Sequence, residues 1–318
     1  MIAERPRIPG YDHAMAMPMI RPMMPADVPE ATRALFDDNW GDRRLWFEFA
    51  TSQPACRAFV AEVDGRILGT GVGTANGPVG WIGTIWVEPR SRGAGLGRAL
   101  TEAVIEALEA AGCRTLVLVA TDAGLRLYER MGFEHQARYQ ILEIPGLAAD
   151  PVPLIDPGSG EGVTAGRPGP GVTAGRPGEV TAFRGDDLPD LCRLDQSATG
   201  EDRAHVIARF ASPEGTKVLR RGDEVVGFVI RAPWGGGATI APDDAAAKVI
   251  LHARRLASGP AGRVRVGIVT PPAGDDARLA RLAAIGLEPV WSAPRLIRGE
   301  PLAWHPERIW GQFNHAMG

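Results

Sequence analysis

The stretch that decides the fold is V-E-P-R-S-R-G-A-G-L-G-R-A-L, residues Val87 to Leu100. It joins a predicted strand, Gly80 to Val87, to a predicted helix from Leu96 to Ala111 whose apolar residues recur at helical spacing. Three glycines occupy alternate positions of the turn. Small residues let successive backbone N–H groups point into one concavity, and the helix N-terminus adds the positive end of its dipole. The turn therefore predicts a site for a pyrophosphate.

This turn differs from the two commonest nucleotide-binding loops. It lacks the G-K-[ST] ending of a P-loop, so ATP is not implied. A Rossmann loop would follow the first strand and precede an acidic residue by about 20 positions, whereas this turn follows several predicted strands. A glycine-rich turn by itself is also consistent with a plain loop that needs positive φ angles. The flanking elements therefore carry the argument.

Those flanking elements predict a mixed α/β sheet with helices packed on its faces. Asp27 followed by Glu30 predicts a helix cap, and Asp64-Gly65 predicts a tight hairpin turn. Strands are expected at residues 20–21, 57–63, 67–74, 80–87, 115–120 and 136–144, and helices at 28–35, 43–49, 96–111 and 124–131.

The rest of the chain predicts two domains with a linker between them. Residues 1–19 are rich in Met and Pro and are expected to form a flexible arm, before a first domain at 20–145. A linker at 146–179 is dominated by Pro and Gly and repeats G-V-T-A-G-R-P-G in tandem. A second domain is expected from Val180 to Gly318, where the order of elements in the first domain recurs in a degenerate form. It has a predicted long helix at 245–257, a strand at 264–269 and a short helix at 279–286.

At this point the chain resembles a known family. Arg92, Gly95 and Gly97 meet motif A of the GNAT superfamily of acyl-CoA N-acyltransferases, and L-Y-E-R-M-G-F, Leu127 to Phe133, is similar to its motif B. With the second half, including G-E-D-R at 200–203, the chain resembles bacterial tandem-GNAT proteins. The resemblance implies two tandem GNAT-like domains, each a mixed β-sheet flanked by helices.

The resemblance also implies which residues hold the cofactor. Trp86 and Val87, at the end of a strand, would pair with the pantetheine arm of acetyl-CoA or another acyl-CoA. Tyr128 matches the tyrosine that in many members protonates the departing CoA thiolate. Thr121 stands where many members carry an asparagine that bonds pantetheine, which puts that contact in doubt. The pyrophosphate would lie on Arg92, Gly93, Ala94, Gly95, Leu96, Gly97 and Arg98.

The function this predicts is transfer of an acyl group, acetyl above all, from CoA to a primary amine of a small molecule. Two alternatives stay open: a donor held on a carrier protein's phosphopantetheine, and a non-catalytic module that binds acyl-CoA. No residue is marked as the base that takes the amine proton. The candidates are a water chain or one of the carboxylates Glu62, Asp37, Asp38 and Glu88.

The second half is expected to bind no CoA. Its matching turn, Thr239 to Lys248, has no glycine and carries Asp243-Asp244, which would repel a phosphate. No tyrosine lies near its short helix, so this half is expected to shape or cover the acceptor pocket. Asp202 and Arg203 could line that pocket or form a helix-capping pair. Trp40, Trp46, Trp81 and Trp86 could form its aromatic walls or pack in the core.

Composition narrows the setting. The net charge of −3, with no long basic run, argues against nucleic acid as a partner. No apolar run approaches the roughly 20 residues of a membrane-spanning helix, and the N-terminus lacks the features of a signal peptide, so a cytoplasmic protein is expected. Three scattered cysteines and six histidines show no metal-ligand spacing, so no metal is expected, and His315 is predicted to lie at the surface.

Overall fold

The computed structural model describes residues 18–148 and 178–318. Nearly all of the predicted arm, and nearly all of the predicted linker, lie outside these ranges. Met19, the last residue of the predicted arm, and Glu179, the last residue of the predicted linker, are the first residues of strands. Within the two described ranges, no helix is long and apolar enough to cross a membrane.

The first half builds the element order that the sequence predicts. Its strands are β1 (Met19–Pro22), β2 (Cys56–Val63), β3 (Arg66–Asn76), β4 (Val79–Val87), β5 (Thr115–Val119) and β6 (Glu134–Pro145). Its helices are α1 (Val28–Asp37), α2 (Arg44–Ser52), α3 (Leu96–Ala110) and α4 (Asp122–Arg130), with short 3-10 turns at Pro25–Asp27 and Pro89–Ser91.

One local prediction in this half is wrong. Asp27 occupies the N-cap position of α1, but its side chain caps no amide of that helix. Its carboxylate accepts instead from the backbone N–H of Met24 and pairs with the Arg21 guanidinium. Glu30 accepts from the backbone N–H of Ile67 on β3. Asp27 therefore binds groups that precede the helix, and Glu30 binds a strand that is distant in the sequence.

Helix α3 packs closely on the sheet because β3 alternates glycine with larger residues. A Cβ atom at Gly69 would lie 2.7 Å from Leu100 Cδ1, and one at Gly73 would lie 2.8 Å from Val104 Cγ1. Both leucine and valine side chains belong to the buried face of α3. Only residues without a side chain allow this approach. The helix that carries the predicted phosphate turn is thereby fixed directly against the central strands.

The second half begins as a smaller version of the first. Its strands are β7 (Glu179–Ala182), β8 (Thr216–Arg221), β9 (Glu224–Ile230), β10 (Thr239–Ile240), β11 (Arg263–Thr270), β12 (Glu288–Gly299) and β13 (Ile309–Gly311). Its helices are α5 (Leu188–Thr199), α6 (Ala204–Phe210), α7 (Asp244–Ser258) and α8 (Asp276–Ala283), with 3-10 turns at Gly185–Asp187 and Pro306–Arg308. Strand β12 was not predicted.

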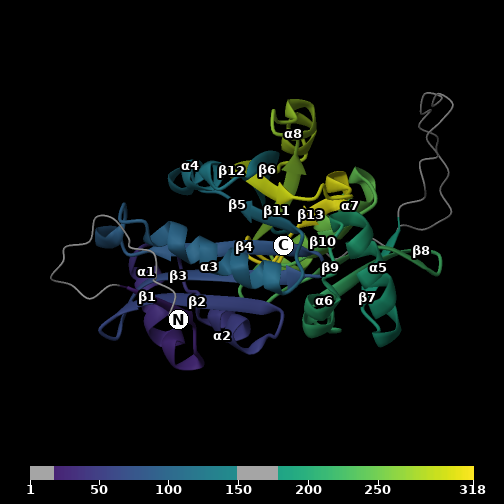
Figure 1. Ribbon diagram of the computed structural model, residues 1–318. Helices are drawn as coiled ribbons and strands as arrows, with labels where there is room; N and C mark the ends of the chain where they lie inside the picture. The colour runs from purple at the N-terminus through teal and green to yellow at the C-terminus, as the bar shows by residue number, and fades with distance from the viewer. Residues whose placement is uncertain (1–17, 149–177) are drawn as a thin grey trace, which may run out of the picture.

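The two halves share strands. The larger sheet has the order β1-β2-β3-β4-β5-β12-β6-β11, so two strands of the second half complete the sheet of the first. Strand β12 runs antiparallel to β5 on one side and to β6 on the other. The smaller sheet, β13-β10-β9-β8-β7, contains only strands of the second half. In Figure 1 the two halves lie side by side, and strands β12, β6 and β11, which come from both halves, run together in the upper part of the view.

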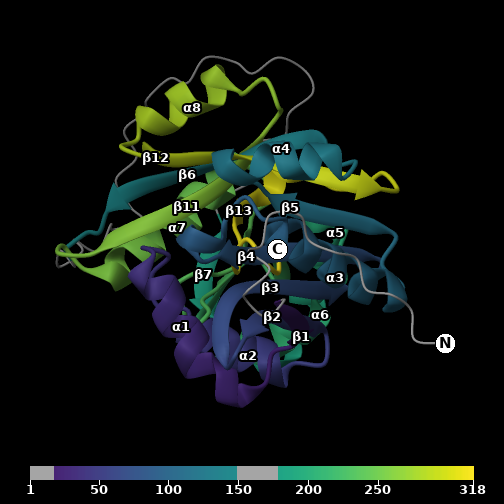
Figure 2. The same ribbon diagram turned by 60° about the vertical axis from the view of Figure 1, so that its left-hand side comes forward.

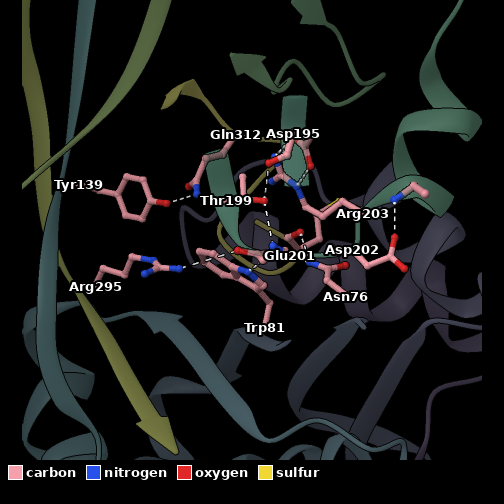
Figure 3. A network of polar contacts seen from close by, with 12 residues as sticks. Asn76, Trp81, Tyr139, Asp195, Thr199, Glu201, Asp202, Arg203, Arg295 and Gln312 are labelled. Carbon is pink, nitrogen blue, oxygen red and sulfur yellow. Dashed lines mark hydrogen bonds and ion pairs between the residues drawn. The ribbon is translucent and has the colours of Figure 1, made fainter. Parts of the chain in front are cut away.

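A buried polar network joins the halves below these strands. Glu201 Oε2 accepts hydrogen bonds of 2.8 Å from Asn76 Nδ2 and from Trp81 Nε1, which both belong to the first half (Figure 3). Arg295 of β12 lies 3.8 Å from the other oxygen of Glu201. Arg203 makes a two-pronged ion pair with Asp195 nearby, at 2.9 and 2.5 Å. The halves therefore share a buried core in which Glu201 of the second half accepts from Asn76 and Trp81 of the first.

The C-terminal end of the chain threads into the same seam. Figures 1 and 2 place it in the middle of the molecule from both directions. The carbonyl oxygen of Ala316 accepts from Thr74 Oγ1 at 2.8 Å, and that of Met317 accepts from Asn76 Nδ2 at 3.0 Å. Ala316, Met317 and Gly318 are buried. The last residues therefore form part of the interior beside β3 and β4.

Candidate active site

The site begins where two central strands separate. Strands β4 and β5 run parallel and pair only from Val79 to Ile82 on β4. Beyond Ile82, β4 continues to Val87, whereas β5 ends at Val119. The facing edge of β4 from Gly83 to Val87 therefore has no strand beside it in the described sheet. Its free backbone groups can pair with an extended ligand as they would with a strand.

A backbone irregularity sits at the start of this open edge. Thr84 has φ of 53°, and the register between β3 and β4 shifts there. A β-branched residue in this conformation costs on the order of 1–3 kcal/mol and needs support from its surroundings. Trp46 Nε1 donates to Thr84 Oγ1 at 3.0 Å, and Thr70 Oγ1 donates to the Thr84 carbonyl at 2.9 Å. This bulge has no signature in the sequence, and it was not predicted.

The glycine-rich turn has the geometry of an anion site. Gly93 and Gly95 have φ of 80° and 87°, which glycine adopts without strain. The first helical hydrogen bond runs from the Ala99 N–H to the Gly95 carbonyl. The amides from Gly93 to Arg98 therefore precede the hydrogen-bonded ladder of α3 and find no backbone acceptor among the described residues. They fit a diphosphate, because such amides and the helix dipole favour negative charge together.

The flanking residues of the turn are partly engaged by the protein itself. Arg92 Nε donates to the Val87 carbonyl at 2.9 Å, and its guanidinium forms an ion pair with Asp38. Asp38 also accepts from Trp86 Nε1 at 2.8 Å. Arg98 pairs with Glu102 one helical turn onward. Arg92 thus links the turn to the end of β4. Trp86 is buried, with its indole N–H bound to Asp38, and it does not line the cavity described below.

Tyr128 lies on α4 with its ring buried against the open edge. The ring packs edge-on against Phe133, with centroids 6.2 Å apart. Burial raises the pKa of the Tyr128 phenol to about 12, so the hydroxyl keeps its proton at neutral pH. A Cβ at Gly124 would lie 2.8 Å from Tyr128 Cε2, so glycine one turn earlier makes room for the ring. Thr121 is the N-cap of α4, and its side chain makes no capping bond.

A cavity of about 480 Å³ lies at the start of the open edge, beside Tyr128. Tyr128 and Thr121 line it, together with Ile82 to Ile85 of β4. Both halves of the chain contribute its walls: Trp40 and Trp46 come from the first half and Trp234 and Trp291 from the second. The predicted aromatic walls are therefore half right, because Trp81 and Trp86 are buried in hydrogen bonds elsewhere.

The remaining polar residues of the cavity differ from the predicted bases. Glu62 pairs with Arg21, and Glu88 pairs with Arg66, so both are engaged outside the cavity. Asp38 lines the cavity, but Arg92 and Trp86 hold its carboxylate. Asp37 lines a different hollow. No carboxylate among these candidates is both free and in the cavity.

The prediction of a surface His315 is wrong. Its ring lines the cavity, lying 5.1 Å from Trp291 and 5.6 Å from Tyr139 between centroids. Burial and the nearby positive charge of Arg43 lower the pKa of His315 to about 4, so the imidazole is neutral at pH 7. Its backbone lies directly over Gly83, where a Cβ atom would come 2.5 Å from the His315 carbonyl oxygen. The sequence gives no sign that the chain end folds inward.

Among residues 178–318, the turn before α7 differs from the glycine-rich turn before α3. Asp243 caps α7 with its own carboxylate, which accepts from the Ala246 N–H at 2.7 Å and pairs with Arg221. Strand β10 pairs with β9 on one side and with β13 on the other, so neither of its edges is open. Asp202 accepts from the Ala204 N–H at the start of α6, but Arg203 pairs with Asp195, so the predicted capping pair is wrong. Neither residue is among those that line the cavity.

The described residues hold few other candidates for chemistry. In residues 18–148 and 178–318, no group of three or more His, Cys, Asp or Glu side chains could hold a metal ion. Cys56, Cys113 and Cys192 are free thiols, and burial raises the pKa of each. These thiols lie outside the cavity.

Comparison with known proteins agrees with this architecture. Residues 21–133 match the model of the acetyltransferase (GNAT) family. A putative acetyltransferase from Pyrococcus horikoshii is 19% identical over 99% of both chains, with a TM-score of 0.71. A GCN5-related N-acetyltransferase from Sphaerobacter thermophilus is 16% identical, over 90% of this chain and 98% of that one, with a TM-score of 0.60.

A further solved structure bears on the two-part organisation. A tandem GNAT protein from the clavulanic acid biosynthesis pathway is 16% identical, over 89% of this chain and 99% of that one, with a TM-score of 0.51. At these identities the solved structures show the fold. The protein therefore has a GNAT fold of mixed α/β type. More particularly, residues 21–133 match the acetyltransferase (GNAT) family model, and 89% of the chain shares the fold of a tandem GNAT protein.

Proposed function

We propose that the protein is an N-acyltransferase that moves an acyl group, acetyl above all, from acyl-CoA to a primary amine of a small molecule. This proposal rests on two features that occur together along the open edge of β4. Unpartnered amides of the turn from Gly93 to Arg98 flank one end of its open edge, and the buried phenol of Tyr128 lies at the other. The family match of this half supports the same activity.

The chain's residues would act on the donor as follows. Turn amides and the N-terminus of α3 hold the diphosphate, and the free edge from Gly83 to Val87 pairs with the pantetheine arm. The acceptor nitrogen attacks the thioester carbonyl, the new C–N bond forms, and the C–S bond breaks. Tyr128 donates its hydroxyl proton toward the departing sulfur, and the proton released by the attacking amine restores the phenol. The raised pKa of Tyr128 keeps that donor protonated throughout the neutral range.

The test combines CoA binding with turnover. Calorimetry measures the affinity of the glycine-rich turn for CoA. Thiol release from acetyl-CoA, with a panel of primary amines, measures the rate of acyl transfer. In Tyr128→Phe we expect kcat to fall on the order of a hundredfold while CoA affinity is retained. Tyr139→Phe is the matched control, because Tyr139 is buried and its hydroxyl contacts Gln312 rather than the cavity.

Two results would speak against the proposal. Unchanged turnover in Tyr128→Phe would remove the phenol from the mechanism. Tight CoA binding without thiol release from any amine would favour a non-catalytic acyl-CoA module or a carrier-protein donor. Acetylated carrier protein, supplied in place of acetyl-CoA with the same amines, separates these two alternatives.

A further inference from the structure

One charged side chain of the cavity has no partner. Arg43 lines the cavity and is partly buried, and its guanidinium makes no hydrogen bond or ion pair with any described residue. Its neighbour Arg44 is exposed and pairs with Glu48 outside the cavity. Arginine stays protonated in proteins, and an unpaired buried charge is costly. Burial lowers the pKa of Arg43 and the nearby charge of Asp42 opposes this, but no carboxylate among the described residues pairs with its guanidinium.

The other charges of the cavity do not cancel it. Asp38 is the carboxylate that lines this cavity, and Arg92 and Trp86 already bind it. Asp42 lies next to Arg43 in the chain, but it is exposed and accepts from the backbone N–H of Arg44. The cavity is thus set to receive one negative charge from a ligand.

We propose that the acceptor is an amine that also carries a carboxylate, which Arg43 binds while the apolar body of the acceptor packs against the tryptophans. The proposal rests on the function proposed above and names the substrate class of the same site. A planar guanidinium binds a carboxylate through two parallel hydrogen bonds, which fixes position as well as charge. A phosphate is a poorer fit, because a dianion would meet one free arginine and the Asp38 carboxylate in the same cavity.

A second polar group beside Arg43 points to a ligand as well. The Nδ1 atom of His315 is buried and has no hydrogen-bond partner among the described residues. The imidazole is close enough for the Arg43 charge to lower its pKa. A neutral imidazole offers one N–H, and a carboxylate bound to Arg43 could accept it. Buried polar atoms are nearly always paired, so this atom is expected to gain a partner when the acceptor binds.

The apolar lining sets the rest of the acceptor. Trp46 and Trp234 pack edge to face with centroids 5.5 Å apart, and Trp291 lines the cavity with 41% of its surface exposed. The volume of about 480 Å³ falls within the range of small-molecule sites. An aromatic or bulky aliphatic body with one amine and one carboxylate matches this combination of walls and charge.

The experiment uses acceptors that differ only in charge. L-Phenylalanine is compared with L-phenylalaninamide, and 4-(aminomethyl)benzoate with 4-(aminomethyl)benzamide, at two spacings between amine and carboxylate. Binding to the CoA-saturated protein is followed by quenching of tryptophan fluorescence, and turnover is followed by thiol release. Hydrogen bonds to a charged group predict that the carboxylate member binds roughly 10- to 100-fold more tightly in at least one pair.

Two variants connect that preference to the residue. Arg43→Gln should remove the preference, chiefly through KM, and leave CoA binding unchanged. Arg44→Gln is the matched control and should keep the preference, since Arg44 faces away from the cavity. Equal binding within both pairs, or a preference that survives Arg43→Gln, overturns this inference alone. Failure to bind CoA, with no thiol release from any amine, defeats the proposed function instead.

Discussion

Replacing Gly124 by alanine tests how the protein positions Tyr128. The added Cβ would lie 2.8 Å from Tyr128 Cε2 and 3.5 Å from its Cζ, whereas ordinary contacts begin near 3.4 Å. The closest atom belongs to a ring that packs against Phe133 and has little room to retreat. We therefore expect the ring to rotate away from Gly124 and to carry its hydroxyl away from the sulfur of the donor.

The magnitude follows from two opposing effects. Overpacking of this kind costs about 1–3 kcal/mol, whereas alanine in place of glycine within a helix contributes about 1 kcal/mol in the other direction. The net loss of stability is then about 0–2 kcal/mol, too small to unfold the protein. Displacement of a catalytic group by an ångström can lower the rate by roughly a hundredfold. Activity should therefore suffer far more than stability.

The assay is a double-mutant cycle of kcat with Gly124→Ala, Tyr128→Phe and the combination. If glycine acts by placing the hydroxyl, the double variant should be no slower than Tyr128→Phe alone. Gly185→Ala serves as a control, because a Cβ at Gly185 meets nothing within 4 Å. Unchanged kcat in Gly124→Ala, or losses that multiply in the double variant, would refute the reasoning.

Three further predictions concern the turn, the chain end and the seam. Gly95→Ala forces alanine into φ of 87° at a cost of about 1–2 kcal/mol, so calorimetry should show weaker CoA binding, and an unchanged Kd would contradict it. The pKa of His315 is lowered, so folding favours its neutral form: its contribution, on the order of 3 kcal/mol, is present above pH 6.5 and is lost as the pH falls toward 4. Urea unfolding at pH 7 and pH 5 should show this slope, and His315→Gln should reduce it. Glu201→Ala leaves Arg295 buried without its carboxylate and should cost about 3–5 kcal/mol of unfolding free energy, while a loss below about 1 kcal/mol would show that the pair is unimportant.

The parts of the fold that were predictable are those with local causes. Asp64 and Gly65 have φ of 48° and 80°, as the Asp-Gly hairpin requires. The glycines of the turn before α3 take the positive φ angles that only their lack of a side chain makes easy. The period of apolar residues located α3 to within one residue at its end. Short-range geometry of this kind can be read from a single sequence.

The parts that escaped prediction are set by distant partners. Strand β12 reads as a loop because it contains two prolines, at Pro289 and Pro294, and its exposed first half follows no simple alternation. Its place between β5 and β6 depends on register with residues more than 140 positions away, which no local pattern records. The strained Thr84 and the half-buried His315 were missed for the same reason, since contacts from α2 and from the end of the chain hold them.

Two strands of the second half, β11 and β12, belong to the sheet of the first half. This explains how the second half can shape the cavity although its own turn before α7 has no glycines. Because β12 lies between β5 and β6, the second half cannot move away without breaking the sheet that contains the open edge of β4 and against which Tyr128 of α4 packs. Trp234, Trp291 and His315 are therefore held in fixed positions opposite the residues of the first half. Under the proposed function, donor binding rests on backbone geometry of the first half, whereas acceptor choice rests on side chains that face each other across the seam. Substitutions at Trp234 or Trp291 should consequently change which amines are used and leave CoA affinity unaltered. If the first half alone formed the acceptor site, these substitutions would change neither property.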